Sequence, residues 1–177
     1  MMTLAAVLCC ALAFNACTKN DPTEPEAPDT TPVAAKMSYS FTLGSDDMVN
    51  MLDVTIDYYD ADGTVKSEAM TGKTWSKTVQ STGLPAKLGA RMRVAVKAEA
   101  NLTAKETFVV SSGYEYVGSA VNKKGENVGE TFGTGSTSTM TIKSSQVAEW
   151  AERHKDGLRK YLHSIAADGS HTSISWE

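Results

Sequence analysis

The chain has 177 residues, of which 41% are hydrophobic, and its formal net charge is −4. One lysine against four acids gives the segment 18–35 a charge of −3, so residues 36–177 carry only −1. The length suits one domain with its own core, and the charge excludes the basic surface by which proteins bind nucleic acid.

The chain begins with an apolar run over residues 4–14. The run is too short to span a bilayer, but it has the length of a signal-peptide core. Asn15, Ala16 and Cys17 follow it, and a small residue directly before a cysteine resembles the lipobox of bacterial lipoproteins. The resemblance implies a signal peptide over residues 1–16 and a lipid anchor on Cys17, which would attach the protein to a membrane.

Four of the five prolines lie within residues 18–35, between acidic residues and threonines. A segment of this composition buries too little apolar surface to fold, so we interpret residues 17–35 as the lipidated Cys17 and a tether. The acidic residues after Cys17 resemble the export signal of Bacteroidetes-type surface lipoproteins. That resemblance implies a location on the outer membrane facing the cell exterior, with the periplasmic face as the alternative.

Cysteine usage excludes a disulfide in the folded domain. Cys9 and Cys10 lie in the predicted signal peptide, Cys17 is the predicted lipidation site, and residues 36–177 contain no cysteine. The domain must therefore be stabilised by core packing alone.

Alternating apolar and polar residues predict two strands, each with one buried face, over residues 37–43 and 52–58. The Asp-Ala-Asp-Gly sequence at 60–63 predicts a hairpin turn, because Gly63 can adopt a positive φ, and residues 64–70 return as a weaker strand. The acidic residues of the turn lack the spacing of an EF-hand loop, so they do not indicate calcium binding.

Residues 74–80 are interpreted as an edge strand, in which an inward Lys77 discourages pairing with another chain. A longer alternating run over residues 91–100 predicts the central strand of the domain. Four shorter strands are expected over residues 105–110, 114–121, 128–132 and 137–143.

The outward face of the predicted central strand carries Arg91, Arg93 and Lys97. Such a basic stripe is able to bind an anionic polysaccharide. The favoured interpretation is a solvated strand face paired with neighbouring acids, because charges on strands are commonly matched in this way.

The apolar period changes near the C-terminus. From about Gln146 to Ala166, apolar residues recur every three or four positions, which predicts one amphipathic helix that can kink at Gly157. Residues 172–176 are then expected to return to the sheet as a short final strand.

Together these elements predict a mainly β domain over residues 36–177. The expected fold is an immunoglobulin-like β-sandwich with one C-terminal amphipathic α-helix and a short final strand. A partly open β-barrel closed by the helix is the alternative. The architecture is similar to the small sandwich domains of Bacteroidetes-type surface lipoproteins, a resemblance that implies no functional residue.

Catalytic motifs are missing from the sequence. It has no Gly-x-Ser-x-Gly elbow and no His-Glu-x-x-His motif. His154 and His163 are nine residues apart and would lie on opposite faces of the predicted helix, where they could not share a metal. No catalytic residue, metal or cofactor is predicted.

The sequence leaves three classes of function. The first is a non-catalytic binding or accessory module, for which Tyr59, Tyr114 and Tyr116 are the candidates to stack on a glycan; the alternative interpretation of these tyrosines is cross-strand packing. The second is a structural or assembly component of the envelope with a protein partner. An enzyme of unrecognised type is the least favoured.

Overall fold

The computed structural model describes residues 27–176 of the chain. The predicted signal peptide and the predicted lipidation site, Cys17, therefore lie outside the described residues. Within the described part, no helix is both long and apolar enough to cross a membrane. The first strand begins at Ala34, and Val33 donates a backbone hydrogen bond to Val121 (2.9 Å), so the last residues of the predicted tether belong to the fold.

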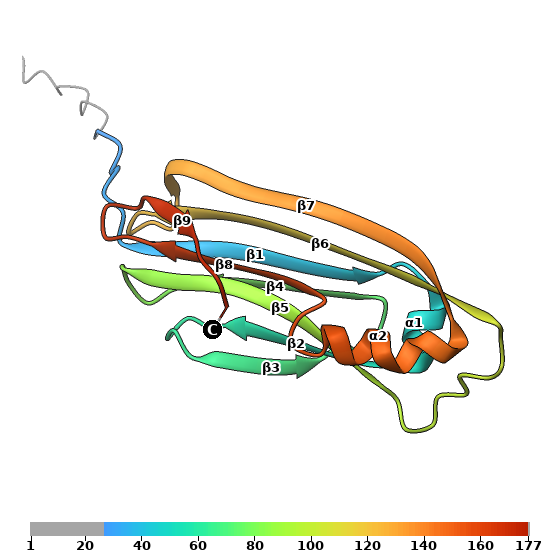
Figure 1. Ribbon diagram of the computed structural model, residues 1–177. Helices are drawn as coiled ribbons and strands as arrows, with labels where there is room; N and C mark the ends of the chain where they lie inside the picture. Colours follow the sequence, from blue (N-terminus) through green and yellow to red (C-terminus); the bar gives the residue numbers. More distant parts are fainter. Residues whose placement is uncertain (1–26, 177) are drawn as a thin grey trace, which may run out of the picture.

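The strands form two antiparallel sheets that face each other (Figure 1). The four-stranded sheet has the order β4-β1-β6-β7, and the five-stranded sheet has the order β3-β2-β5-β8-β9. The strands are β1 (Ala34–Leu43), β2 (Leu52–Tyr59), β3 (Val65–Ala69), β4 (Thr74–Gln80), β5 (Ala86–Val96), β6 (Thr107–Val121), β7 (Asn127–Lys143), β8 (Arg159–Ile165) and β9 (His171–Ser173). The sheets do not close into a barrel, so the β-sandwich is confirmed and the barrel alternative is wrong.

The core lies between the two sheets, because the strands that cross the middle alternate apolar and polar side chains. Met37, Tyr39 and Phe41 of β1 are at most 1% exposed. From the facing sheet, Ile56 of β2 and Met92 of β5 are fully buried. Burial of each large apolar side chain stabilises the fold by about 1.5 to 3 kcal/mol. This core determines which face each strand turns inward.

The connections follow a Greek-key path. β1 and β4 are neighbours in one sheet, and β2, β5 and β8 are neighbours in the other. In an immunoglobulin domain, strands B and E are neighbours in one sheet, and strands C, F and G are neighbours in the other. β1 and β4 therefore correspond to strands B and E, and β2, β5 and β8 correspond to strands C, F and G. The long hairpin of β6 and β7 is inserted between β5 and β8, and it places β6 beside β1.

Both strands of this hairpin are longer than the sequence predicted. β6 is continuous where two strands were expected, and so is β7. Gly113 does not end β6, because it pairs with Thr42 of β1 on one side and with Thr137 of β7 on the other. A Cβ at this position would lie 2.6 Å from Oγ1 of Thr42 and 2.9 Å from Oγ1 of Thr137, so the glycine leaves room for these two side chains. The central strand β5 also starts earlier than expected and ends at Val96.

The predicted helix over residues 146–166 is wrong in its second half. After the short 3-10 turn η1 (Ser144–Gln146), α2 covers only Val147–His154, and the chain then enters β8. Gly157 has a φ of +147° and separates the two elements. A short apolar run such as 159–165 suits either a helix or a strand, and here pairing with β5 selects the strand. The expected final strand is present as β9.

A short helix that the sequence analysis did not predict, α1 (Asp46–Met51), covers the start of β6. Asp47 accepts a hydrogen bond from the backbone N–H of Val109 (2.8 Å), and Gly44 donates one to the carbonyl of Ser111 (2.7 Å). The edge of β6 that extends beyond β1 is therefore occupied.

Candidate functional site

Two of the three candidate tyrosines lie between the sheets. Tyr114 and Tyr116 of β6 face Tyr161 of β8, with ring centroids 5.6 Å and 4.2 Å from that of Tyr161. The hydroxyl of Tyr116 lies 2.9 Å from Nε2 of the buried His163. The guanidinium of Arg159 lies 5.8 Å from the ring centroid of Tyr114. These contacts occupy the ring faces that a sugar would need.

Tyr59 lies elsewhere, on the outer face of the five-stranded sheet. Its ring centroid is 5.2 Å from that of Trp176, and the guanidinium of Arg91 lies 4.8 Å from the Trp176 ring. The structure therefore brings Tyr114 and Tyr116 together between the sheets, whereas Tyr59 lies apart from them on the outer face of the five-stranded sheet. A groove of about 340 Å³ runs beside Tyr114 and is lined by Lys160, Tyr161 and residues 173–176.

Two of the three basic residues of the stripe, Arg91 and Arg93, pair with Asp57 of β2, which is 2% exposed. One carboxylate oxygen of Asp57 accepts hydrogen bonds from Nε of Arg91 (2.8 Å) and Nε of Arg93 (2.7 Å). The other accepts from Arg93 (2.9 Å) and from the hydroxyl of Ser67 (2.6 Å). Burial raises the pKa of Asp57, but the hydrogen bonds from the two arginines and Ser67 outweigh burial and hold its pKa below the ordinary value. Arg91 and Arg93 are therefore paired with an acid, as the favoured interpretation expected, whereas Lys97 donates a hydrogen bond to the carbonyl of Val49 (3.0 Å).

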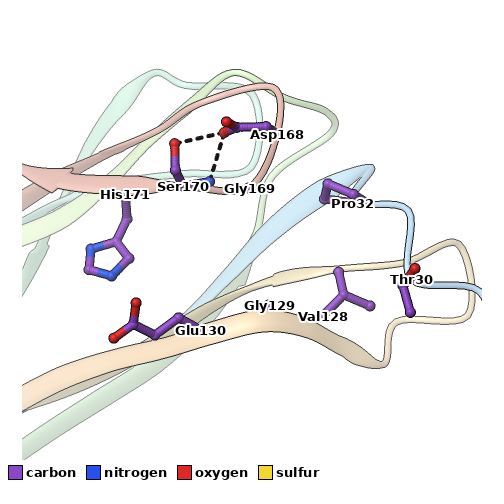
Figure 2. A pocket seen from close by; sticks show the side chains of 9 residues that line it. All are labelled: Thr30, Pro32, Val128, Gly129, Glu130, Asp168, Gly169, Ser170 and His171. Carbon is purple, nitrogen blue, oxygen red and sulfur yellow. Dashed lines mark hydrogen bonds between the residues drawn. The ribbon is translucent and has the colours of Figure 1, made fainter.

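A second hollow, of about 370 Å³, lies at the end of the sandwich where the chain enters (Figure 2). Glu130 and His171 contribute side chains to it. The carboxylate of Asp168 accepts hydrogen bonds from the backbone (2.9 Å) and hydroxyl (2.7 Å) of Ser170, which belong to the local turn. Over residues 27–176 there is no group of three or more His, Cys, Asp or Glu side chains arranged to hold a metal. This hollow therefore provides no metal-binding or nucleophilic arrangement.

The most extended accessible feature is the free edge of β7. Within the described residues, no strand pairs with the outer edge of β7. Nearly the whole strand is exposed, apart from Val128, Phe132 and Ile142. The register shifts near Gly118, which leaves residues 132–143 as an uninterrupted ladder with β6. We call residues 132–143 the β7 edge.

The direction of the free backbone groups follows from the register. On β6, the N–H groups of Val109 and Ser111 point away from β7, towards α1. In an antiparallel ladder, residues opposite such positions also direct their N–H and C=O groups outward. Thr139 and Thr141 are these opposite residues. The direction of the backbone groups alternates along a strand, so the N–H and C=O groups of Gly133, Gly135 and Thr137 also point outward.

The composition of the β7 edge does not protect it. Natural proteins block an open edge with charged residues or proline. Residues 131–142 contain neither. The other three edge strands of the described structure are shorter: β3 has five residues, β4 has seven and β9 has three. The sequence analysis missed this edge because it divided the strand in two. The signal that could have found it is the run of threonines alternating with small residues.

Comparisons of the chain with protein-family models, with curated proteins and with solved structures found no match. The class of the protein is therefore defined by its architecture alone: a β-sandwich with one long, unprotected edge strand.

Proposed function

We propose that the protein is a non-catalytic binding or accessory module of the cell envelope, anchored through Cys17, that binds an extended protein segment along the β7 edge. The single observation that carries this proposal is a strand of 17 residues whose outer edge has no partner in the described structure. Addition of a strand to an open sheet edge is a recurrent mode of peptide recognition.

The energetics favour an extended partner. Five residues from Gly133 to Thr141 offer both a donor and an acceptor to a new strand. Each hydrogen bond contributes about 0.5 to 1.5 kcal/mol net, part of which is offset by the cost of ordering the partner. Glycines at two of these positions leave room for the side chains of the added strand. The edge therefore supports binding through the backbone, with modest preference for sequence.

The placement of the edge fits an anchored protein. Asn122, at the turn between β6 and β7, donates a hydrogen bond to the carbonyl of Asp29 (2.8 Å). β7 therefore starts at the end of the sandwich where the chain enters, and it runs away from that end (Figure 1). An anchor on Cys17 would leave the length of β7 open to partners.

Glycan binding is the second candidate function, and the groove beside Tyr114 is the observation that favours it. Trp176 and Lys160 line this groove, and aromatic and polar groups together suit a sugar. It is the weaker candidate, because Tyr114 and Tyr116 pack against other rings.

The strand-addition proposal is tested with a synthetic ten-residue peptide of alternating threonine and valine. We expect Thr137→Pro, which removes one outward N–H, to weaken peptide binding by about tenfold or more. Thr137→Val keeps the N–H and should bind as well as the wild-type protein. Equal binding by both variants, or faster amide exchange at Thr139 with peptide present, would refute strand addition.

The anchor and the glycan candidate have separate tests. Cys17→Ser should move the protein from the membrane fraction to the soluble fraction, and an unchanged membrane fraction would contradict the anchor. Binding on a glycan array that is lost in Tyr114→Ala, and retained in Tyr59→Ala, would favour the groove over the β7 edge.

A further inference from the structure

We infer that the partner of the β7 edge is a second copy of this chain, paired antiparallel through its own β7. This inference rests on the proposed function, because it names the strand that is added. Two copies related by a twofold axis would join their four-stranded sheets into one continuous sheet.

The backbone geometry determines how the copies face each other. The outward N–H and C=O groups of β7 all belong to odd-numbered residues, from Gly133 to Thr141. An antiparallel ladder exchanges hydrogen bonds between residues that lie directly opposite, so an odd residue must face an odd residue. Side chains on the inner face then lie beside inner side chains of the other copy. Both five-stranded sheets therefore lie on the same side of the joint sheet.

One register uses every free group from Gly133 to Thr141. With Thr137 opposite Thr137 of the second copy, Gly135 faces Thr139 and Gly133 faces Thr141. Each glycine then faces a threonine, so the outer face has no crowded pair. On the inner face the exposed Met140 (47%) lies opposite Thr134.

Charge also favours this partner. No charge lies within residues 131–142, so pairing of β7 with itself places no like charges opposite each other. A second copy therefore brings an uncharged strand to an uncharged strand, whereas charges on a foreign strand would have no partners along this stretch.

The structure also limits the assembly to two copies. The register shift before Phe132 interrupts the β7 ladder at one end, and β7 ends at Lys143. The opposite edge strand, β4, turns Lys77 inward to form an ion pair with Glu68. Further copies cannot pair on β4 without burying this charge pair. An anchor at Cys17 would hold copies on one membrane and raise their effective concentration.

The first experiment locates the twofold axis by disulfide formation in the full chain, in detergent, with Cys9, Cys10 and Cys17 changed to serine. Thr137→Cys in this background should oxidise rapidly to a covalent dimer, because opposite residues lie about 5.5 Å apart at Cα. Thr141→Cys is the matched control. In the inferred register its two copies lie roughly 27 Å apart, so it should remain monomeric. Equal cross-linking of both variants would overturn the register.

The second experiment measures association without a new thiol. Sedimentation equilibrium of the same background should show a dimer, and Thr137→Lys should weaken dimerisation by about tenfold or more, because two lysines would meet at the axis. Thr78→Lys, the same change on the outer face of β4, should not. A background chain that is monomeric but binds the threonine-valine peptide would overturn the second-copy inference and leave strand addition intact. A chain that neither dimerises nor binds the peptide would overturn both.

Discussion

Along β4, Lys77 points between the sheets and forms an ion pair with Glu68 of β3, whereas along β7 the inward positions from Thr134 to Met140 carry no charge and are exposed. These two strands are the opposite edges of one sheet. A single inward lysine thus closes one side of the sandwich, and its absence leaves the other side open to another strand. Edge protection is a property of particular side chains and not of the fold.

The β4 side is closed by a small polar network. Glu68 accepts hydrogen bonds from Nε1 of Trp75 (2.9 Å) and from the hydroxyl of Tyr58 (2.8 Å), in addition to Lys77. Hydrogen bonds from these three donors lower the pKa of Glu68 to about 2, and the bond from Lys77 has the largest effect. The network joins β4 of one sheet to β2 and β3 of the other.

β7 itself has no comparable polar link to the facing sheet among the described residues. The facing strand, β9, has only three residues, and His171 of β9 stacks on Phe132 with ring centroids 4.0 Å apart. Beyond this contact, β9 does not reach the middle of β7. The shortness of β9 is therefore the physical reason that the inner face of β7 is exposed.

The largest expected effect concerns the closed side, where Asp57 joins β2 to Ser67 of β3. Asp57→Ala should lower the free energy of unfolding by about 3 kcal/mol, near the lower end for a broken buried ion pair, because both arginines keep some contact with water. Urea denaturation measures the loss. Asp53→Ala, an exposed acid on the same strand, is the control and should change stability little. Equal effects of the two variants would show that the Asp57 cluster does not stabilise the fold.

The acid dependence of this variant follows from the depressed pKa of Asp57. The stabilisation by Asp57 is present above its ordinary pKa of 3.8 and is lost as pH falls through the lowered folded pKa. The stability of Asp57→Ala should therefore approach that of the wild type at strongly acidic pH. A constant difference at all pH values would contradict this assignment.

Replacing the inward lysine of β4 should make the two edges more alike. Lys77→Met removes the ion pair with Glu68, which is worth about 1 kcal/mol or less because both groups are partly exposed. The informative change is in association: β4 should become able to pair, and light scattering should detect species larger than the dimer. Lys87→Met, at an exposed position on β5, should not produce them. Stable dimers in both variants would show that Lys77 does not protect the edge.

The two sides should also respond differently to mild acid. His163 of β8 is 5% exposed beneath the β7 side, and burial, with the nearby His171, lowers its pKa below the ordinary 6.5. A lowered histidine pKa gives stability that is complete above about pH 6.5 and is lost as pH falls towards the folded pKa. Glu68 loses its contribution only at far lower pH.

We therefore expect His163→Gln to flatten the decline in stability that begins near pH 6.5, as measured by urea midpoints across pH. His154→Gln, on the half-buried end of α2, serves as the control and should retain the decline. An unchanged decline in His163→Gln would assign it to another group.

The smallest expected effect is on the β7 edge itself. Thr134 is exposed on the inner face, so Thr134→Ala should change the stability of the monomer by only about 0.5 kcal/mol or less. Thermal unfolding at a concentration below dimerisation measures this change. A loss of several kcal/mol would show that the middle of β7 is packed, and would contradict the comparison of the two edges.

Local sequence was sufficient for the elements whose patterns have one solution. The alternation over residues 37–43 and 52–58 predicted β1 and β2, because a period of two with apolar residues on one side fits only a half-buried strand. Gly63 predicted the hairpin turn, and its φ is +78°. The edge position of β4 was also predicted, from the inward Lys77.

Pairing between distant segments decided the rest. Residues 159–165 have an apolar pattern that suits a helix or a strand, and hydrogen bonding to β5 decided for the strand. The partners of Arg91 and Arg93 depended on which acid lay beside them, and register with β2 brought Asp57 there. The exposure of the inner face of β7 depended on the length of β9, which lies further along the chain and belongs to the facing sheet. The sequence of a strand determines which of its faces is buried. Which strand lies beside it depends on how the whole chain folds, and in the described structure the outer edge of β7 has no neighbouring strand.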